Sequence, residues 1–313
     1  MKILLCGDFD AAEAAEWRQA LGAAMPEAEW LDLAGARAQA DQVRAAVVAN
    51  PPPGSLQGLP SLCLIQSLWA GVDRLLADAS LPANVPIARM VDPAMNAAMA
   101  ETAVWAVLAL QRDFFTYAQQ QRRTEWRQHA QRRADEWPVL VLGQGEMGRT
   151  AARRLVAMGF PVTGWSRHEG AAEPGTRRVH GEAALAPALA AARVLVNLLP
   201  LTPQTENLLD ARRFAQLPRG AGLVNLARGR HVVDADLLAA LDSGQLSHAV
   251  LDVFRGEPLA SDHPFWHHER VTVLPHVAAQ TDARSAAAVA VANLRALRDG
   301  APLRHAVDRA RGY

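Results

Sequence analysis

The stretch VLVLGQGEMGRTAARRLVAM, residues 139–158, decides the fold expected for this chain. Its first four residues are apolar and predict a buried strand, and GQGEMG at 143–148 is a glycine-rich turn. The residues that follow the turn have the composition of a helix. A strand, a G-x-G-x-x-G turn and a helix, in that order, form the context in which this motif binds a dinucleotide. We therefore predict a Rossmann domain around this stretch.

Each glycine of the turn has a separate physical role in this prediction. Gly143 permits the tight turn, Gly145 lets the backbone approach a pyrophosphate, and Gly148 allows close packing of helix on strand. The free N–H groups at the start of the helix then favour the phosphates. We assign Gly143, Gly145, Glu146, Met147 and Gly148 to cofactor binding, the alternative being a glycine-rich turn with no ligand.

The end of the next expected strand, VTGW at 162–165, predicts the type of cofactor. An NAD-binding chain would carry an acidic residue there for the ribose 2′-hydroxyl, whereas this chain has Ser166 and Arg167. A hydroxyl beside a permanently charged guanidinium suits a 2′-phosphate, and Glu169 comes too late to replace the acidic residue. We expect NADPH rather than NADH, the alternative being that Arg167 is an ordinary surface arginine.

Short apolar runs spaced by helical patterns continue on both sides of this stretch and predict parallel sheets with helical crossovers. The expected class is α/β, with two doubly wound parallel-sheet domains and a cleft between them. A Rossmann cofactor domain is expected over 98–282. A flavodoxin-like substrate domain is expected over 1–97 and 283–313, because a helix after Thr281 returns the chain to it. The expected strands lie near 2–6, 28–33, 45–49, 62–68, 139–142, 162–165, 194–199, 222–226, 249–254 and 271–274.

Composition argues against several classes of partner. Thirty-two basic and 32 acidic residues give a formal net charge of zero, so nothing points to nucleic acid or to an anionic membrane. The basic segment 119–137 contains acidic residues and is expected to be a solvated helix face or a connecting arm. No targeting segment is visible, and the apolar run 103–110 is too short to span a bilayer, so we expect a cytoplasmic protein.

Three residues beyond the turn together predict a reaction. Arg228 follows the strand expected at 222–226, Glu257 lies in FRGEPL, and His276 lies in LPHVAAQT. A guanidinium can hold the carboxylate and carbonyl of a 2-keto acid, an imidazolium can protonate the carbonyl oxygen, and a carboxylate keeps that imidazole charged. We prefer Arg228 to Arg230 because it lies nearer the strand end.

Other histidines do not point to a metal. His263, His267 and His268 cluster in DHPFWHHER, but their spacing matches no familiar metal motif. We expect them to be surface residues and assign no metal site.

At this point the chain resembles the D-isomer-specific 2-hydroxyacid dehydrogenase family. The resemblance lies in GQGEMG, LLPLT (198–202), NLARG (225–229), LDVF followed by EPL, and PHVA (275–278). The WSR sequence at 165–167 and the closing VDRARGY (307–313) resemble its glyoxylate/hydroxypyruvate reductase A branch. The match is close over 139–282 and at the C-terminus, and weaker before residue 139, where AGVD (70–73) carries it.

The resemblance implies a homodimer and further site residues. Leu199 and Pro200 would line the cofactor, and Asp252 would contact the nicotinamide carboxamide. Backbone N–H groups of Ala70, Gly71 and Val72 would hold the substrate carboxylate, which agrees with their place between a strand and a helix.

Two departures from the family's pattern put the size of the substrate in doubt. Ala49-Asn50 stands where a tryptophan is expected in this branch, and Trp69 stands where a small residue is commoner.

The predicted function is NADPH-dependent reduction of a small 2-keto acid, glyoxylate or hydroxypyruvate. A bulkier 2-keto acid, or a nucleotide-sensing interaction protein of the corepressor type, are the alternatives. A β-hydroxyacid dehydrogenase shares the glycine turn but uses a catalytic lysine, and the only lysine here is Lys2.

Overall fold

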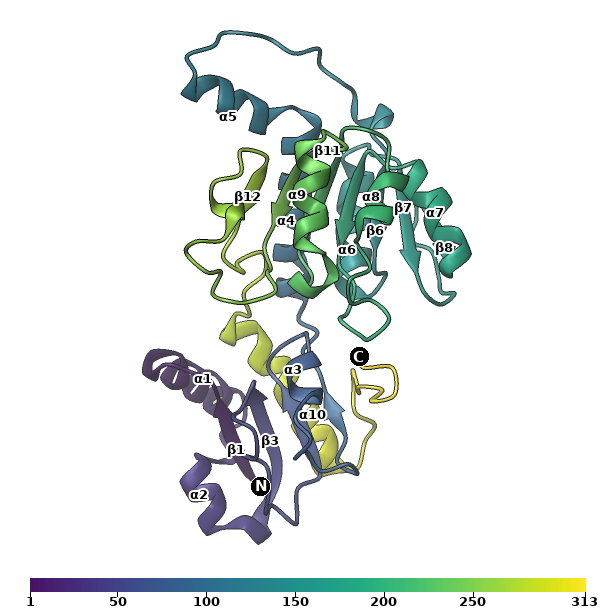
Figure 1. Cartoon of the computed structure of the whole chain (residues 1–313). Coiled ribbons are helices and arrows are strands. Elements are labelled where there is room, and N and C mark those ends of the chain that lie inside the picture. Colours follow the sequence, from purple (N-terminus) through teal and green to yellow (C-terminus); the bar gives the residue numbers. More distant parts are fainter. The chain divides into compact units, whose positions relative to one another are not determined.

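The computed structural model describes residues 1–313 and contains two compact α/β units, each built around one parallel sheet (Figure 1). Unit 1 comprises Met1–Met95 and Thr281–Tyr313, and unit 2 comprises Asn96–Gln280. The chain passes between the units two residues before each boundary expected from the sequence. Two parallel-sheet α/β domains are thus confirmed.

Unit 1 has the strand order 2-1-3-4-5, which is that of flavodoxin-like sheets. Every pair of neighbouring strands is parallel. The strands are β1 (Lys2–Gly7), β2 (Glu29–Leu31), β3 (Val43–Ala49), β4 (Leu64–Ser67) and β5 (Ile87–Ala88). The helices are α1 (Ala11–Ala24), α2 (Leu33–Ala38), α3 (Asp73–Leu76) and α10 (Ala283–Asp299), with a 3₁₀ turn at Ala40–Gln42.

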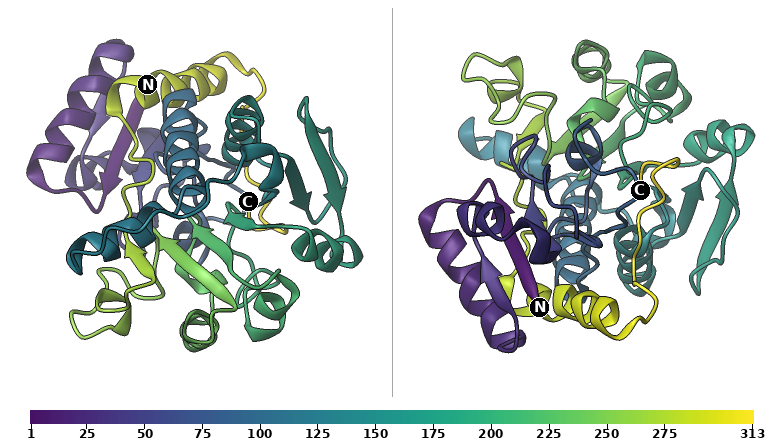
Figure 2. Two further views of the ribbon diagram at one scale, coloured as in Figure 1. Left: turned by 90° about the horizontal axis from the view of Figure 1, so that it is seen from above. Right: turned by 90° about the horizontal axis from the view of Figure 1, so that it is seen from below.

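Unit 1 is closed by a helix from the far end of the chain. Helix α10 packs against α1 and β4, and Figures 1 and 2 show α10 in yellow-green beside the purple α1. Asn293 of α10 donates to Gln66 of β4 at 2.7 Å, and both side chains are fully buried. An amide pair of this kind satisfies two buried polar groups at once, so it favours one register of helix on sheet.

Unit 2 has the order β12-β11-β10-β9-β6-β7-β8, again with parallel neighbours throughout. Numbered within the unit, this is the Rossmann order 3-2-1-4-5-6 with a seventh strand added at one edge. The strands are β6 (Val139–Leu142), β7 (Val162–Ser166), β8 (Thr176–His180), β9 (Val194–Asn197), β10 (Ala221–Asn225), β11 (Leu246–Leu251) and β12 (Val271–Val273). Strand β8, TRRVH, was not expected, because its residues are mostly polar and do not form the apolar run that predicts a strand.

The helices of unit 2 cover both faces of the sheet. They are α4 (Pro93–Gln111, which begins in unit 1), α5 (Phe114–Arg122), α6 (Glu146–Ala157), α7 (Glu182–Ala190), α8 (Ala211–Gln216) and α9 (Asp234–Asp242). Short 3₁₀ turns lie at Ala134–Glu136, Gly229–His231 and Pro264–Trp266. Figure 1 shows α8 and α9 in front of the sheet and α4 behind it.

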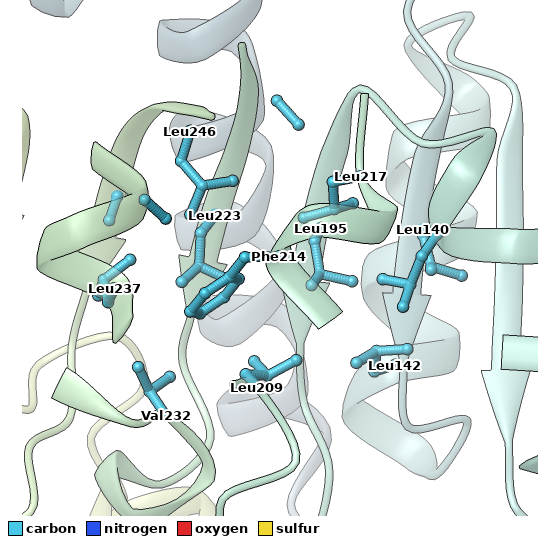
Figure 3. Close-up of a cluster of buried hydrophobic side chains, with 14 of the residues drawn as sticks. Leu140, Leu142, Leu195, Leu209, Phe214, Leu217, Leu223, Val232, Leu237 and Leu246 are labelled. Atoms are coloured by element: carbon cyan, nitrogen blue, oxygen red, sulfur yellow. The ribbon is translucent and has the colours of Figure 1, made fainter. Parts of the chain in front are cut away.

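The alternation of side chains along β6 divides the core in two. Val139 and Val141 pack with α4 and α6, whereas Leu140 and Leu142 pack with α7, α8 and α9. Figure 3 shows the second cluster, with Phe214 of α8 among the leucines that the strands contribute. Phe214 is almost fully buried, and its removal would cost about 3–5 kcal/mol.

Residues 95–115 belong to two helices rather than one. Helix α4 ends at Gln111 and α5 begins at Phe114, after Asp113 adopts a left-handed backbone with φ of 56°. By length and composition alone, α4 is long and apolar enough to cross a membrane, whereas the apolar run 103–110 within it is too short. Its alanine and valine side chains instead pack in the core of unit 2, which explains its apolar character.

Candidate active site

The three residues assigned to the reaction lie just beyond the carboxyl ends of three neighbouring strands. Arg228 follows β10, Glu257 follows β11, and His276 follows β12. The carboxyl ends of parallel strands meet at one edge of a sheet, where ligands of such folds bind. Strand order alone therefore explains how residues far apart in the sequence come together here.

His276 and Glu257 form a direct pair. The imidazole Nδ1 lies 2.8 Å from Glu257 Oε2, and Glu257 Oε1 accepts a hydrogen bond from the Phe254 N–H at 2.9 Å. An ionised carboxylate can only accept, so Nδ1 carries a proton. The other ring nitrogen, Nε2, remains for a substrate.

The contact shifts both titrations toward the charged forms. The hydrogen bond that His276 donates to Glu257 raises the pKa of His276 above its ordinary value, although burial and Arg228 oppose the rise. Burial alone would raise the pKa of Glu257, but the hydrogen bonds from His276 and the Phe254 N–H, with the charges of His276 and Arg228, lower it. The pair thus favours an imidazolium beside a carboxylate.

Arg228 lies close enough for its charge to act on both members of the pair, lowering the pKa of each. Its Nη1 donates to the Ala227 carbonyl at 2.8 Å, and its own carbonyl accepts from Asn225 Nδ2 at 3.1 Å. Arg230, the other arginine considered, pairs instead with Glu206 at 2.7 Å on the surface. The two arginines therefore have different surroundings.

Asp252 holds the loop that carries His276. Its carboxylate Oδ1 accepts from the N–H groups of Val277 at 2.7 Å and Ala278 at 3.0 Å, and its carbonyl accepts from the His276 N–H at 3.0 Å. Burial raises the pKa of Asp252, and the two amide hydrogen bonds oppose that rise. This support was not foreseen, and the predicted contact with a nicotinamide stays a prediction.

A buried polar network that sequence reasoning missed ties two loops together. Asn197 Nδ2 lies 2.9 Å from both Asn225 Oδ1 and His231 Nδ1, and His231 Nε2 lies 3.2 Å from the Pro200 carbonyl. All three side chains are fully buried. Because the amide nitrogen donates to Nδ1, the proton of a neutral His231 must reside on Nε2, facing Pro200. A polar residue ending each of two paired apolar strands, β9 and β10, was the available signal.

The glycine turn has the shape required for a pyrophosphate. A Cβ on Gly143, which has φ of 90°, would lie 2.5 Å from the Leu198 carbonyl oxygen, and one on Gly148 would lie 1.8 Å from that of Gly143. A Cβ on Gly145 would meet nothing within 4 Å. Two glycines are thus required by packing, and the third borders open space at the start of α6, where Glu146 and Met147 follow.

Leu199 and Pro200 begin the loop after β9. Leu199 is buried and its N–H donates to Asn197 Oδ1 at 3.3 Å. The Pro200 carbonyl also accepts from Thr205 Oγ1 at 2.8 Å. The loop is therefore held at both residues.

Ser166 ends β7 and Arg167 follows it directly. Ser166 Oγ donates to the His168 carbonyl at 2.6 Å and accepts from Arg178 Nη2 at 2.8 Å. Arg167 Nη1 donates to Gln204 Oε1 at 3.0 Å. Arg178 was not foreseen, since the strand that carries it was not.

In unit 1, Ala70, Gly71 and Val72 connect β4 to the single turn of helix α3. None of their three N–H groups donates a hydrogen bond within the protein. Trp69 just before them is fixed by a bond from its N–H to Ser67 Oγ at 3.0 Å.

Two of the three histidines of DHPFWHHER lie beside carboxylates. His263 Nε2 is 3.7 Å from Asp234, and His268 Nε2 is 3.2 Å from Asp242. No group of three or more His, Cys, Asp or Glu side chains is arranged to hold a metal ion.

Fold and site together define a class. A Rossmann sheet, a glycine turn open to a pyrophosphate and an acid–base pair at the same sheet edge are the parts of a dinucleotide-dependent oxidoreductase.

Comparisons with known proteins specify the family. Residues 104–278 match the model of the D-isomer specific 2-hydroxyacid dehydrogenase NAD binding domain. A glyoxylate/hydroxypyruvate reductase A from Serratia proteamaculans is 39% identical over 321 residues, covering 100% of both chains. A D-isomer specific 2-hydroxyacid dehydrogenase from Xanthobacter autotrophicus Py2, solved with NADPH and MES, has a TM-score of 0.94 and 40% identity, covering 100% of this chain and 99% of that one.

A second solved structure is the NADPH-dependent glyoxylate/hydroxypyruvate reductase from Sinorhizobium meliloti in complex with NADP and sulfate. Its TM-score is 0.92 at 35% identity, covering 100% of this chain and 99% of that one. The present chain belongs to the D-isomer specific 2-hydroxyacid dehydrogenase family. The resemblance noted in the sequence is confirmed.

Proposed function

We propose that the protein reduces small 2-keto acids, glyoxylate or hydroxypyruvate, to 2-hydroxy acids with NADPH. The observation that carries the proposal is the 2.8 Å contact between His276 and Glu257, with the charge of Arg228 acting on both. The names of its relatives from Serratia and Sinorhizobium support the substrate class, and the NADPH or NADP in two solved relatives supports the cofactor.

The residues that would hold the dinucleotide are those of the glycine turn, with Ser166 and Arg167 at the 2′-phosphate and Leu199, Pro200 and Asp252 toward the nicotinamide. When bound, the nicotinamide supplies a hydride to the carbonyl carbon of the substrate. Arg228 binds the substrate carboxylate and polarises the carbonyl oxygen, a charge-assisted contact of roughly 1.5–3 kcal/mol. We also propose that the amides of Ala70, Gly71 and Val72 bind a substrate carboxylate.

His276 acts as the general acid. Its Nε2 proton passes to the carbonyl oxygen as negative charge develops there, which contributes on the order of 10²–10⁴ in rate. The imidazole becomes neutral in that step and regains a proton from solvent before the next cycle. Glu257 keeps its charge throughout, holds the ring in position and favours the protonated state at the start of each cycle.

A bulkier 2-keto acid is the second candidate. Trp69 precedes the three free amides of unit 1, and Ala49 is buried at the end of β3 with Asn50 in a left-handed conformation (φ of 45°) after it. Substrate size is the property that these positions would change. We also propose a homodimer and a cytoplasmic location, in line with the sequence.

The test is NADPH oxidation, followed by absorbance, with glyoxylate, hydroxypyruvate and phenylpyruvate in turn, repeated with NADH. We expect fast turnover of the small acids with NADPH and slower turnover with NADH. A preference for phenylpyruvate would select the bulkier substrate class. No turnover with any keto acid would reject the enzyme assignment in favour of a nucleotide-sensing interaction protein.

A further inference from the structure

Arg178 occupies an unusual place for a strand arginine. It lies on β8 opposite Gly164 of β7, and its guanidinium reaches the end of β7. Nη2 donates to Ser166 Oγ at 2.8 Å, and Nη1 donates to the Ala171 carbonyl at 3.1 Å. Its Nε is buried and has no hydrogen-bond partner.

The distance to Ser166 limits how far Arg178 can be from a 2′-phosphate. A phosphate oxygen that replaces the His168 carbonyl as the acceptor of the Ser166 hydroxyl proton would lie about 2.7 Å from Oγ. The same oxygen would then be at most about 5.5 Å from Arg178 Nη2. A guanidinium at this range attracts a dianion strongly, and a small rotation of its side chain gives direct contact.

Positive charge exceeds negative charge around Ser166. Glu173 is the buried carboxylate of this region, and it accepts from both Arg149 and Arg153. Arg178 has no carboxylate partner; burial, followed by the charge of Arg149, lowers the pKa of its guanidinium. Arg178 is partly buried, and a partly buried cation without a counterion costs the free protein solvation energy that an anionic ligand would offset.

We infer that Arg178 is a third residue that recognises the 2′-phosphate of NADPH, together with Ser166 and Arg167. The inference rests on the proposed cofactor and adds to it a residue from a different strand. Arg167 directly follows Ser166 at the end of β7, whereas Arg178 donates to Ser166 Oγ from the neighbouring strand β8. Residues of two adjacent strands, β7 and β8, thereby determine the preference for NADPH over NADH.

If Arg178 had only a structural role, its loss would change the binding of the two cofactors in a different way from the one that phosphate recognition predicts. If its bonds to Ser166 and to the Ala171 carbonyl only fix the crossover between β7 and β8, its loss should weaken binding of NADP⁺ and NAD⁺ alike. If it recognises the phosphate, only the binding of NADP⁺ should weaken. The ratio of the two affinities separates these roles.

The experiment is titration calorimetry of the full chain with NADP⁺ and with NAD⁺. We expect Arg178→Gln to raise the Kd for NADP⁺ by about 10- to 100-fold and to leave that for NAD⁺ within about twofold. Arg178→Lys keeps the charge but loses the planar guanidinium. Its Kd for NADP⁺ should therefore lie between that of the unaltered protein and that of Arg178→Gln. It also serves as the test if the glutamine variant does not fold.

The matched control is Arg177→Gln. Arg177 is the neighbouring residue on β8, but it is exposed and borders α7 with Val179, on the opposite face of the sheet. Its replacement should change neither affinity. An NADP⁺ preference in the unaltered protein that survives Arg178→Gln would overturn the inference while leaving the proposed function intact. Equal affinities for the two cofactors in the unaltered protein would reject the NADPH assignment, and the inference with it.

Discussion

Two carboxylates of unit 2, Glu173 and Glu257, each accept hydrogen bonds from a cationic partner, and their surroundings differ. Glu173, before β8, is 5% exposed and is held by Arg149 and Arg153 of α6, two groups that stay charged at any ordinary pH. Glu257, after β11, is 36% exposed and faces His276, which is 52% exposed and titrates. The first arrangement fixes a loop, whereas the second presents a proton.

The comparison shows that an ion pair is informative about function only when one partner can change its charge. The hydrogen bond from Arg153, followed by that from Arg149, lowers the pKa of Glu173 despite its burial. Nothing in that cluster can gain or lose a proton near neutral pH. At Glu257 the partner is the proposed general acid, which would give up its proton to a substrate and take one back from solvent, so the same type of contact would serve catalysis.

Removing the proton donor should have the largest effect. We expect His276→Ala to lower kcat for keto acid reduction by at least about 10²-fold, because the variant lacks the proposed proton donor. NADPH affinity, measured by fluorescence titration, should be nearly unchanged. Undiminished turnover would remove His276 from the mechanism.

Removing the substrate cation should have the next largest effect. Arg228→Gln is expected to lower kcat/KM by about 10- to 100-fold, the equivalent of one charge-assisted contact. Arg230→Gln is the matched control, because that arginine pairs with Glu206 on the surface, and it should retain kcat/KM within about twofold. A larger loss at Arg230 than at Arg228 would reverse our assignment.

Neutralising the carboxylate of the titrating pair should shift the pH profile. Glu257→Gln removes the largest cause of the raised pKa of His276, so that pKa should fall. Reduction needs the imidazolium, so its kcat/KM declines as pH rises through this pKa, and the decline should move to lower pH in the variant. Oxidation of the 2-hydroxy acid needs the neutral ring and should rise at lower pH than in the unaltered protein. Coincident profiles would contradict the role given to Glu257.

Neutralising the other carboxylate should change stability and leave the pH profile of turnover in place. Because the pKa of Glu173 is lowered in the fold, its ionised carboxylate stabilises the protein at pH values above the ordinary pKa of a glutamate. This stabilisation is lost as the pH falls through the lowered pKa. We expect Glu173→Gln to lower the free energy of unfolding by about 1–3 kcal/mol at pH 7, which corresponds to several degrees in Tm. The difference in stability between variant and unaltered protein should be smaller at acidic pH. The exposed Glu169→Gln is the control and should leave Tm unchanged. Equal Tm values for the two variants would show that the buried cluster adds no stability.

Much of this architecture could be predicted because apolar patterns and the glycine turn report local structure. The strands of unit 2 with valine and leucine, such as β6, were found, and their order placed Arg228, Glu257 and His276 at one edge. Strand β8 was missed because four of its five residues are polar, and Arg178 was missed with it. Edge strands need less apolar sequence than central ones, so pattern alone underestimates them.

Long-range polar contacts were the other omission. The network of Asn197, Asn225 and His231 depends on which strands are neighbours, and a buried asparagine looks like any other in a sequence. Asp252 was assigned a role by resemblance, and only the structure shows that it also supports the His276 loop. Such contacts follow from the register of the strands rather than from local composition.

The packing of α10 on β4 has a consequence for the order of folding. During synthesis, residues 96–280 leave the ribosome before α10 does, so unit 2 can complete its sheet first. Unit 1, although it starts the chain, still lacks the helix that supplies Asn293 to the buried Gln66. Its β4 therefore keeps an uncovered surface for as long as the whole of unit 2 takes to be translated, which is when this protein most needs protection from aggregation.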